Sequence, residues 1–294
     1  MTSGPVIRAE NLSKTYHDGW LAPKDIQALA GVSFDVQPGE VFGLLGPNGA
    51  GKTTFIKILL GIIRKTGGRA ELLDHEAGDP RGREKVGYLP ERLVVPKHHT
   101  GYTALEYYGQ LSGMTLAEVE ARRNDVLELV GLSDRADDQV LKYSKGMQQR
   151  LGLGQALMHN PELLILDEPT DGLDPVGRAQ VRKILDKLRD EGKTIFLNSH
   201  LLQEVELICD RVAILDRGAL KRVGPVDEMT EATAGDKPTP AKKKAKPVLQ
   251  VEMEVAGEEE AVRKAVGARP LPEWRVLSPG RIRLTTVLDD QAAV

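Results

Sequence analysis

The sequence has 294 residues, of which 40% are hydrophobic and 28% are charged, and its formal net charge is −3 at pH 7. This length accommodates one large domain and a small appendage, and the near-neutral charge excludes binding to nucleic acid or anionic lipid through overall electrostatics. No apolar run approaches the ~20 residues of a transmembrane helix, and the N-terminus lacks the pattern of a signal peptide. Cys209 is the only cysteine, which excludes an internal disulfide. We therefore expect a cytoplasmic protein.

Continuous apolar runs separated by helical segments predict an α/β fold with a parallel sheet covered on both faces. Val41–Leu45 is the first such run, and it is followed by a glycine-rich turn and a helix that begins near Lys52. Similar runs at residues 162–169, 193–200 and 211–218 predict further strands of the same sheet.

The segment from about residue 100 to residue 158 has helical rather than strand periodicity. Thr103, three residues before Glu106, predicts a capping box near the start of its first helix. Apolar residues at helical spacing, such as Val119 and Val126, extend the pattern. We interpret this segment as a helical subdomain inserted in the α/β core.

The composition changes after the predicted main domain, residues 5–232. Residues 233–247 contain five lysines and three prolines without a large apolar side chain, which is typical of a linker. Contact of these lysines with anionic lipid, at ~1 kcal/mol for each lysine, is the alternative interpretation.

The last segment, residues 248–294, has its own pattern. Residues 248–255 and 281–287 alternate apolar and polar positions as strands do, and residues 257–268 have the pattern of a short helix. The sequence therefore predicts a small α+β accessory domain, either regulatory or a dimer contact.

Residues 46–53 match the G-x-x-x-x-G-K-[ST] phosphate loop, with a predicted strand before it and a predicted helix after it. Glycines let successive backbone N–H groups turn toward a phosphate, and the dipole of the following helix stabilises its charge. Lys52 would bridge the β- and γ-phosphate oxygens, and the Thr53 hydroxyl would bind Mg²⁺. The flanking elements favour this interpretation over a chance match. The predicted nucleotide-binding residues here are Gly46, Pro47, Asn48, Gly49, Ala50, Gly51, Lys52, Thr53 and Thr54.

Two acidic residues end the apolar run at residues 162–169. Asp167 would hold Mg²⁺, through water, because Mg²⁺ keeps several of its waters in proteins. Glu168 follows where a general base or a water-orienting group belongs beside the γ-phosphate. The alternative is that both acids only solvate the end of the strand, and the phosphate loop in the same chain favours chemistry over it.

Five short motifs follow one another in the order GPNGAGKTT, YSKGMQQR, LLILDEP, DGLD and NSH. In this order they make residues 5–225 resemble the nucleotide-binding subunit of an ABC (ATP-binding cassette) transporter, where they are Walker A, signature, Walker B, D-loop and switch-histidine motifs. YSKGMQQRL and GYLPE further resemble subunits of two-component exporters, whose permease is a separate polypeptide. The resemblance implies a P-loop NTPase core with a mixed or parallel sheet, an N-terminal antiparallel β part and a helical insertion.

The resemblance also implies a head-to-tail dimer that holds two ATP molecules between its subunits. Ser144 and Gly146 would then contact the γ-phosphate held by the phosphate loop of the other copy, and Asp174 would link the two sites. An N-cap is the ordinary structural role of a serine such as Ser144, and it is the alternative for this residue. Lys145 and Met147 stand where the family usually has glycine and glutamine.

Three further residues receive roles from the resemblance. His200 aligns with the histidine that contacts the γ-phosphate and the attacking water. Tyr16 is similar to the aromatic residue that stacks on adenine, and the long segment after it leaves Trp20 as the alternative. Glu91 stands where most members have the glutamine that contacts Mg²⁺ and the attacking water and senses the permease. We expect Glu91 to keep these roles with a stronger dependence on Mg²⁺, and a solvated loop glutamate is the alternative.

These observations predict an ATPase with ATP and Mg²⁺ as ligands, catalysed by Lys52, Glu168, His200 and Glu91. Its expected partners are a second copy of the chain and an integral membrane permease that holds it at the inner face of the membrane, and no nucleic acid is expected. A soluble ABC-type ATPase acting on ribosomes or DNA is the alternative, and a module that binds ATP without hydrolysis is a third. The presence of one cassette disfavours the second, and the complete set of reactive residues disfavours the third.

Overall fold

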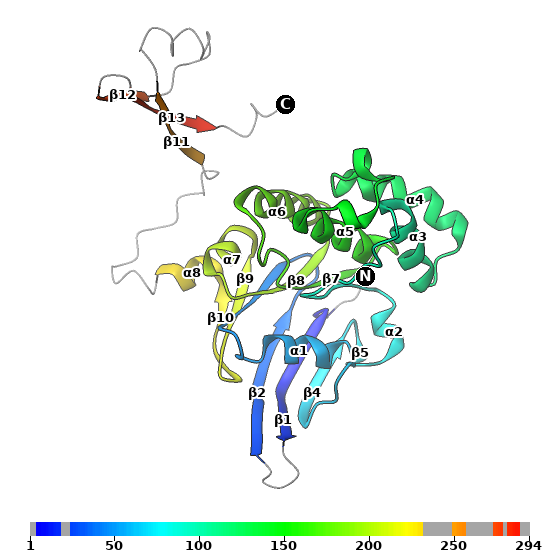
Figure 1. Ribbon diagram of the computed structural model, residues 1–294. Coiled ribbons are helices and arrows are strands. Elements are labelled where there is room, and N and C mark those ends of the chain that lie inside the picture. The colour runs from blue at the N-terminus through cyan, green and yellow to red at the C-terminus, as the bar shows by residue number, and fades with distance from the viewer. Residues whose placement is uncertain (1–3, 19–23, 232–248, 257–272, 279–280, 289–294) are drawn as a thin grey trace. The chain divides into compact units, whose positions relative to one another are not determined.

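The structure, a computed structural model, describes residues 4–18, 24–231, 249–256, 273–278 and 281–288 (Figure 1). The chain divides into two compact units, residues 1–236 and 237–294. The predicted linker at residues 233–247 and the predicted helix at residues 257–268 lie outside the described residues.

The centre of the first unit is a six-stranded sheet. Its strands are β3 (Val41–Leu45), β6 (Val86–Leu89), β7 (Leu163–Asp167), β8 (Thr194–Ser199), β9 (Arg211–Asp216) and β10 (Ala219–Pro225). They lie in the order β10-β9-β3-β8-β7-β6, with β10 antiparallel at one edge and all other neighbours parallel. The apolar runs therefore form buried, mostly parallel strands, which confirms the predicted α/β class.

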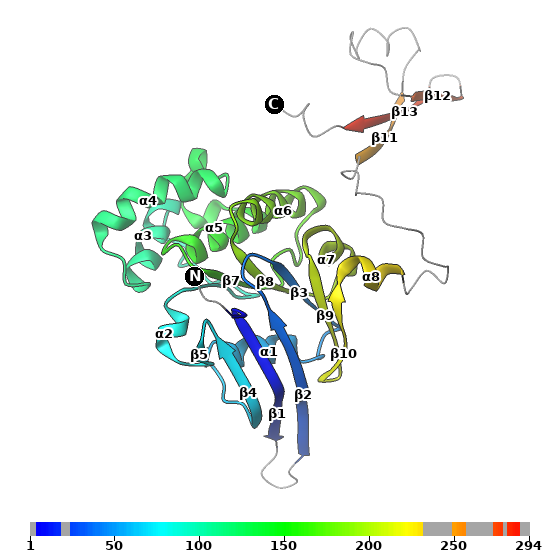
Figure 2. The same ribbon diagram turned by 180° about the vertical axis from the view of Figure 1, so that it is seen from behind.

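Both faces of this sheet are covered, one by helices and the other by a helix and a second sheet (Figure 2). The helices are α1 (Lys52–Leu59), α5 (Lys145–Leu157), α6 (Pro175–Asp190), α7 (Leu202–Ile208) and α8 (Val226–Glu231). Along β7, Leu163 and Ile165 join the buried cluster on the side of α1, whereas Leu164 and Leu166 join the cluster that includes α5, α6 and α7. This alternation explains why the strand is apolar at every position.

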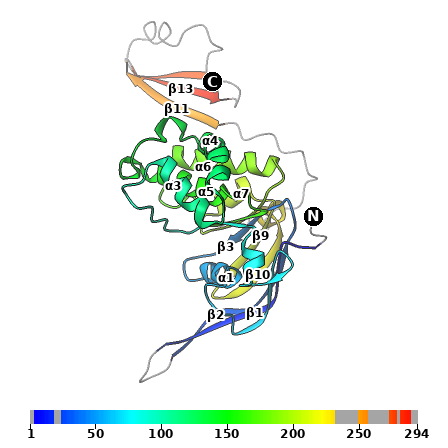
Figure 3. The ribbon, with the colours of Figure 1, turned by 90° about the vertical axis from the view of Figure 1, so that its right-hand side faces the viewer.

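The second sheet is antiparallel. Its strands are β1 (Ile7–Asp18), β2 (Lys24–Val36), β4 (Gly67–Leu72) and β5 (His75–Glu76), in the order β2-β1-β4-β5, and the short helix α2 (Pro80–Arg83) follows them. Figure 3 shows β1 and β2 extending together beyond the rest of the first unit. The antiparallel N-terminal part implied by the resemblance is therefore present.

A layer of aromatic rings joins the two sheets. It consists of all four phenylalanines of the sequence, Phe34, Phe42, Phe55 and Phe196. Their ring centroids lie 4.9–6.4 Å apart in the stacked pairs. Because Phe55 belongs to α1, the layer fixes the helix that begins at Lys52 against β2, β3 and β8.

The helical segment lies between β6 and β7 in the chain. It consists of α3 (Gly101–Leu111), α4 (Leu116–Leu129), the short 3₁₀ helices η1 (Ser133–Arg135) and η2 (Val140–Lys142), and α5. Figure 1 shows α3, α4 and α5 packed together at one end of the first unit. Among the described residues, no helix has the length and apolar content needed to span a bilayer.

The predicted start of α3 at Thr103 is wrong. The helix begins at Gly101 and is capped by Thr100, whose Oγ1 accepts a hydrogen bond from the N–H of Thr103 at 3.3 Å. Gly101 packs against Ala136 and Tyr143, where a side chain would collide, so a residue that looks like a helix breaker is the first residue of the helix. The Thr-x-x-Glu capping box opens α4 instead, at Thr115.

The second unit contains three antiparallel strands. They are β11 (Leu249–Ala256), β12 (Glu273–Ser278) and β13 (Arg281–Leu288), in the order β11-β13-β12. The two predicted strands correspond to β11 and β13. Strand β12 was not predicted, because its sequence EWRVLS has a single pair of alternating apolar positions, too few for period two to stand out.

Candidate active site

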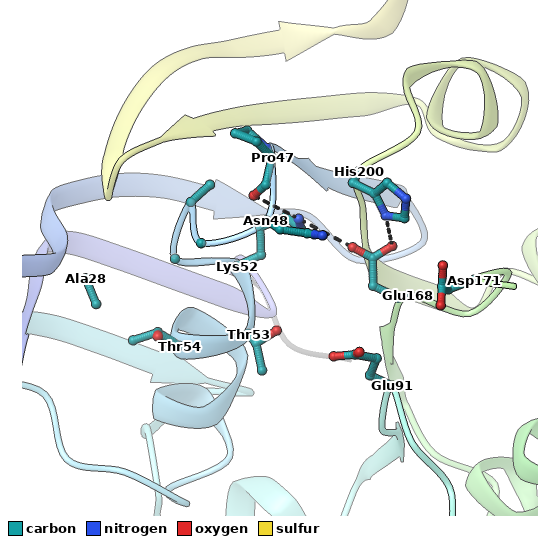
Figure 4. Close-up of a pocket in the computed structure, with 13 residues that line it drawn as sticks. Ala28, Pro47, Asn48, Lys52, Thr53, Thr54, Glu91, Glu168, Asp171 and His200 are labelled. Atoms are coloured by element: carbon teal, nitrogen blue, oxygen red, sulfur yellow. Dashed lines mark hydrogen bonds and ion pairs between the residues drawn. The ribbon is translucent and has the colours of Figure 1, made fainter.

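A cavity of about 340 Å³ lies where the strands β3 and β7 end, at the edge of the sheet where open α/β sheets bind ligands. Residues 47–54 form one wall, and Glu91, Glu168 and His200 lie across from them (Figure 4). Gly46 lies at the base of the loop, where a side chain would collide with the carbonyl oxygen of Leu215. The segments that follow four neighbouring strands, β3, β6, β7 and β8, thus meet at one cavity.

Two glycines give the phosphate loop its shape. Gly49 and Gly51 have φ angles of 82° and 107°, which glycine adopts without strain. A Cβ atom at Gly51 would also collide with the carbonyl oxygen of Ala28 in β2. Because Gly51 precedes α1, no side chain caps the N–H groups of the first helical turn. These groups fit a phosphate, which accepts their hydrogen bonds and is stabilised by the helix dipole.

Lys52 is the buried cation of the cavity, with 6% of its surface exposed. Its Nζ donates a hydrogen bond to the carbonyl oxygen of Gly46 at 2.6 Å and lies 3.4 Å from Glu168 Oε1. A buried ammonium group needs such partners. The oxygens of a phosphate are stronger partners of the same kind, so this position fits an anion between Lys52 and the loop.

Glu168 and His200 form a second pair on the opposite wall. Glu168 has a φ of 51°, which is uncommon for a residue with a side chain, and its Oε2 lies 2.9 Å from His200 Nδ1. An ionised carboxylate only accepts hydrogen bonds, so Nδ1–H is the donor of this pair. Backbone strain of this type gathers at functional sites, and here it directs a carboxylate into the cavity (Figure 4).

Asp167 precedes Glu168 at the end of β7, with 1% of its surface exposed. Its Oδ1 accepts a hydrogen bond from Asn198 Nδ2 at 2.6 Å and lies 3.4 Å from Thr53 Oγ1. Burial raises the pKa of Asp167, the hydrogen bond from Asn198 lowers it, and the charges of Glu91 and Glu168 raise it further. A carboxylate and a hydroxyl beside further negative charge fit Mg²⁺, which prefers oxygen ligands together with phosphate and water.

Glu91, after the end of β6, lies across the cavity from Thr53 (Figure 4). Its negative charge also acts on Tyr88, where burial, Asp167 and Glu91 together raise the pKa to about 12. The charge of Glu91 also raises the pKa of Asp167, so the two carboxyl groups interact electrostatically. This placement fits a residue that contacts a cation at Thr53 and Asp167, and the role stays a prediction.

Replacement of Glu91 by glutamine is expected to raise the Mg²⁺ concentration for half-maximal ATPase activity roughly fivefold, because one charge near a metal contributes about 1 kcal/mol in a hydrated site. Titration of Mg²⁺ at saturating ATP measures this shift. Asp171→Asn is the matched control, since it removes a charge from another part of the same cavity. Identical titrations of Glu91→Gln and the unsubstituted protein would contradict a metal contact.

The signature segment lies at a different cavity of about 330 Å³. Ser144 caps α5, with its Oγ accepting a hydrogen bond from the N–H of Met147 at 3.2 Å. Asp174 caps α6 in the same way, through the N–H of Gly177 at 2.7 Å. Ser144, Gly146 and Asp174 therefore lie together, and they do not line the cavity of the phosphate loop in the same chain.

The two unusual residues of the signature have local explanations. Lys145 Nζ lies against Gly172, whose φ of 64° suits glycine and where a Cβ atom would collide with the ammonium group. Met147 is partly buried against the hydrophobic cluster of the helical segment. The lysine side chain therefore lies between the start of α5 and the D-loop, and the methionine packs where a polar side chain would be desolvated.

Tyr16, the residue predicted to stack on adenine, does not line either cavity. It lies in β1 with 37% of its surface exposed, and Lys14 Nζ is 4.9 Å from its ring centroid. The residues lining the cavity include Ala28 of β2 but not Tyr16. Trp20 lies outside the described residues, so stacking on adenine stays a prediction for either aromatic residue.

One buried residue was missed as a functional candidate. Asn198 is fully buried at the end of β8 and hydrogen bonds to both acids of the site. The signal in the sequence was a single amide after the apolar residues of TIFLN, and only the neighbouring strand reveals its partners.

Comparison with known proteins agrees with this geometry. The family model described as ABC transporter matches residues 29–171. The chain is 47% identical over 226 residues to an uncharacterised ABC transporter ATP-binding protein of Synechocystis sp., over 76% of this chain and 64% of that protein. It is 41% identical over 232 residues to the fluoroquinolones export ATP-binding protein of Mycobacterium tuberculosis, over 77% of this chain and 72% of that protein. The chain thus spans slightly less than two thirds of the first of these relatives.

Solved structures are similar over most of the chain. The protein cbiO1 from Clostridium perfringens, part of the ABC transporter complex cbiONQ, has a TM-score of 0.69 at 27% identity, over 79% of this chain and 92% of that chain. The dimeric structure of MJ0796, a bacterial ABC transporter cassette, has a TM-score of 0.67 at 25% identity, over 75% and 98%. The share of the chain that is covered is about as long as the first unit. The fold is that of these cassettes.

Proposed function

This chain belongs to the family of ABC transporter ATP-binding proteins, and on that premise we propose that it hydrolyses ATP to drive a separate membrane permease in the direction of export. The observation that carries the proposal is the convergence of Lys52, Glu168 and His200 on the cavity of the phosphate loop. The relatives described above are named as transporter subunits, and one is named for export. These names favour a transporter subunit over an ATPase that acts on ribosomes or DNA.

Catalysis would depend on the placement of charges, as is usual in phosphoryl transfer. Lys52 exchanges its contacts with Gly46 and Glu168 for the β- and γ-phosphate oxygens of ATP. Glu168, now free of the lysine, accepts a proton from the water whose oxygen attacks the γ-phosphorus. The bond from that phosphorus to the bridging oxygen breaks, and ADP and phosphate are released. His200 donates Nδ1–H to Glu168 and keeps its carboxylate directed toward the water.

Thr53, Asp167 and Glu91 are the residues that would hold Mg²⁺ beside the phosphates. The ion supplies positive charge to the phosphate oxygens as negative charge develops on them. Thr53 offers a hydroxyl from the first turn of α1, and Asp167 offers a carboxylate whose position is fixed by Asn198.

A solved structure of the cassette MJ0796 is a dimer bound to ADP and phosphate. We infer a head-to-tail dimer in which Ser144 and Gly146 contact the γ-phosphate held by the phosphate loop of the other copy. Ser144 and Gly146 line a different cavity from the phosphate loop of the same chain. This separation supports the arrangement, because the two residues would contact ATP at a phosphate loop only from another copy. Asp174, in the same cavity as Ser144, would carry the contact between the two sites.

The permease would hold the chain at the inner face of the cell membrane. Recovery of the full chain in the membrane fraction only when a permease with several apolar spans is produced with it would support this location. Equal recovery with and without the permease would contradict it.

The first test of the function is the Lys52→Ala variant. We expect it to lose ATP binding and hydrolysis, because the buried cation that faces the phosphates is removed. Binding of a fluorescent ATP analogue and release of phosphate measure the two losses. Lys57→Ala is the matched control, since Lys57 is an exposed lysine of the same helix. Retained ATP binding by Lys52→Ala would contradict the assignment of the phosphate site.

A further inference from the structure

Asn198 is the one fully buried residue with a carboxamide in the described part of the chain. It lies near the C-terminal end of β8, directly opposite Asp167 in the parallel pairing of β7 and β8. The three residues before it, Ile195, Phe196 and Leu197, are apolar and buried. The packing of the sheet alone therefore accounts for an apolar residue at this position and not for an amide.

The carboxamide joins the two acids of the site. Asn198 Nδ2 donates a hydrogen bond to Asp167 Oδ1 at 2.6 Å, and Asn198 Oδ1 accepts one from the backbone N–H of Glu168 at 2.6 Å. The orientation of the amide is fixed by its partners, because a backbone N–H can only donate and an ionised carboxylate can only accept. Exchange of the nitrogen and oxygen would lose both bonds.

The bond to Glu168 acts at a strained point of the backbone. Glu168 has a φ of 51°, and its carbonyl oxygen accepts a hydrogen bond from the N–H of Asp171 at 3.2 Å, so the chain turns sharply after β7. Asn198 holds the N–H at the start of this turn. The side chain of Glu168 is thereby placed between Lys52, at 3.4 Å, and His200, at 2.9 Å.

We propose that Asn198 is a positioning residue for ATP hydrolysis, which fixes the metal-binding carboxylate of Asp167 and the backbone of the general base Glu168 with one side chain. The inference rests on the proposed function and adds to it a residue that touches neither nucleotide nor water. Because residues 46–54 form the binding wall, loss of Asn198 affects turnover and leaves nucleotide binding in place.

The test is Asn198→Leu, which keeps the number and branching of the side-chain heavy atoms and removes both hydrogen bonds. We expect kcat to fall about 10- to 100-fold, as for other residues that orient a ligand or a base, with the KM for ATP changed by less than about twofold. Combination with Glu168→Gln should lower kcat by less than the product of the two single effects, because Asn198 acts in part through Glu168. The Asn198→Leu protein should also accumulate an ATP-bound dimer in size-exclusion chromatography, a readout other than turnover.

A second variant and a matched control keep the result interpretable. Asn198→Asp is isosteric and keeps an oxygen toward Glu168 while it loses the N–H toward Asp167, so it should also lower kcat. Thr194→Val, at the other end of the same strand, removes the hydrogen bond that Thr194 Oγ1 accepts from the N–H of Gly39 and should keep kcat. A folded Asn198 variant with kcat within twofold of the unsubstituted protein would overturn the inference. An unsubstituted protein without ATPase activity would overturn the proposed function instead.

Discussion

Glu168→Gln is expected to lower ATP turnover by about a hundredfold or more while ATP binding is retained, because the amide cannot accept the proton of the attacking water. Glutamine has the size of glutamate, and the phosphate loop and Lys52 remain in place to hold ATP. With hydrolysis blocked, the dimer should persist with ATP bound. Phosphate release in the steady state measures turnover, and size-exclusion chromatography with and without ATP measures the dimer.

The control for this variant is Glu162→Gln. Glu162 comes just before the same strand, and its exposed side chain pairs with Lys85 at 2.8 Å, so it shares the strand without reaching the cavity. Turnover of the control should match that of the unsubstituted protein. Turnover by Glu168→Gln at the unsubstituted rate would remove the assignment of Glu168 as the base.

Ser144→Arg is expected to eliminate hydrolysis and to leave ATP binding at Lys52 intact. The substitution removes the cap of α5, at about 1 kcal/mol, and places a long cation in the cavity that Ser144 shares with Asp174. Because this cavity is separate from the one lined by residues 47–54, binding of ATP to a single copy is unaffected. Hydrolysis would fail because the second copy cannot close over the γ-phosphate.

Thr115→Arg is the control that separates the loss of a helix cap from the placement of a cation in the cavity. Thr115 caps α4 in the same helical segment, with its Oγ1 accepting a hydrogen bond from the N–H of Glu118 at 3.3 Å, and it lies at neither cavity. This control should lose some stability and keep its ATPase activity. Hydrolysis by Ser144→Arg at the rate of the control would contradict the shared site.

The core of the fold was predictable from local sequence. An apolar run predicted the strand at Val41–Leu45. The glycine-rich phosphate loop, which lies between a strand and a helix, predicted the helix at Lys52. In contrast, β1 has no period-two pattern, because its pairing shifts register between Ala9 and Leu12 and Asn11 has a φ of 47°. Bulges of this kind move apolar side chains out of alternation, so residue patterns alone did not reveal the strand, and only the family resemblance implied it.

The site was predictable where a motif fixes its residues and not where a contact joins distant segments. Lys52, Glu168 and His200 were named from motifs, and they do line one cavity. The hydrogen bond of Asn198 to Asp167 spans 31 residues of sequence and depends on the register of two strands. No pattern within either strand contains that information.

The layer of phenylalanines between the two sheets has a practical consequence for spectroscopy. Since the sequence contains only Phe34, Phe42, Phe55 and Phe196, uniform incorporation of fluorinated phenylalanine would put every label in one place. One label would sit on the helix that starts at Lys52, and another would sit two residues before Asn198. Four fluorine resonances would then report on the packing of the two sheets and of α1, with no signal from the helical segment or from the second unit.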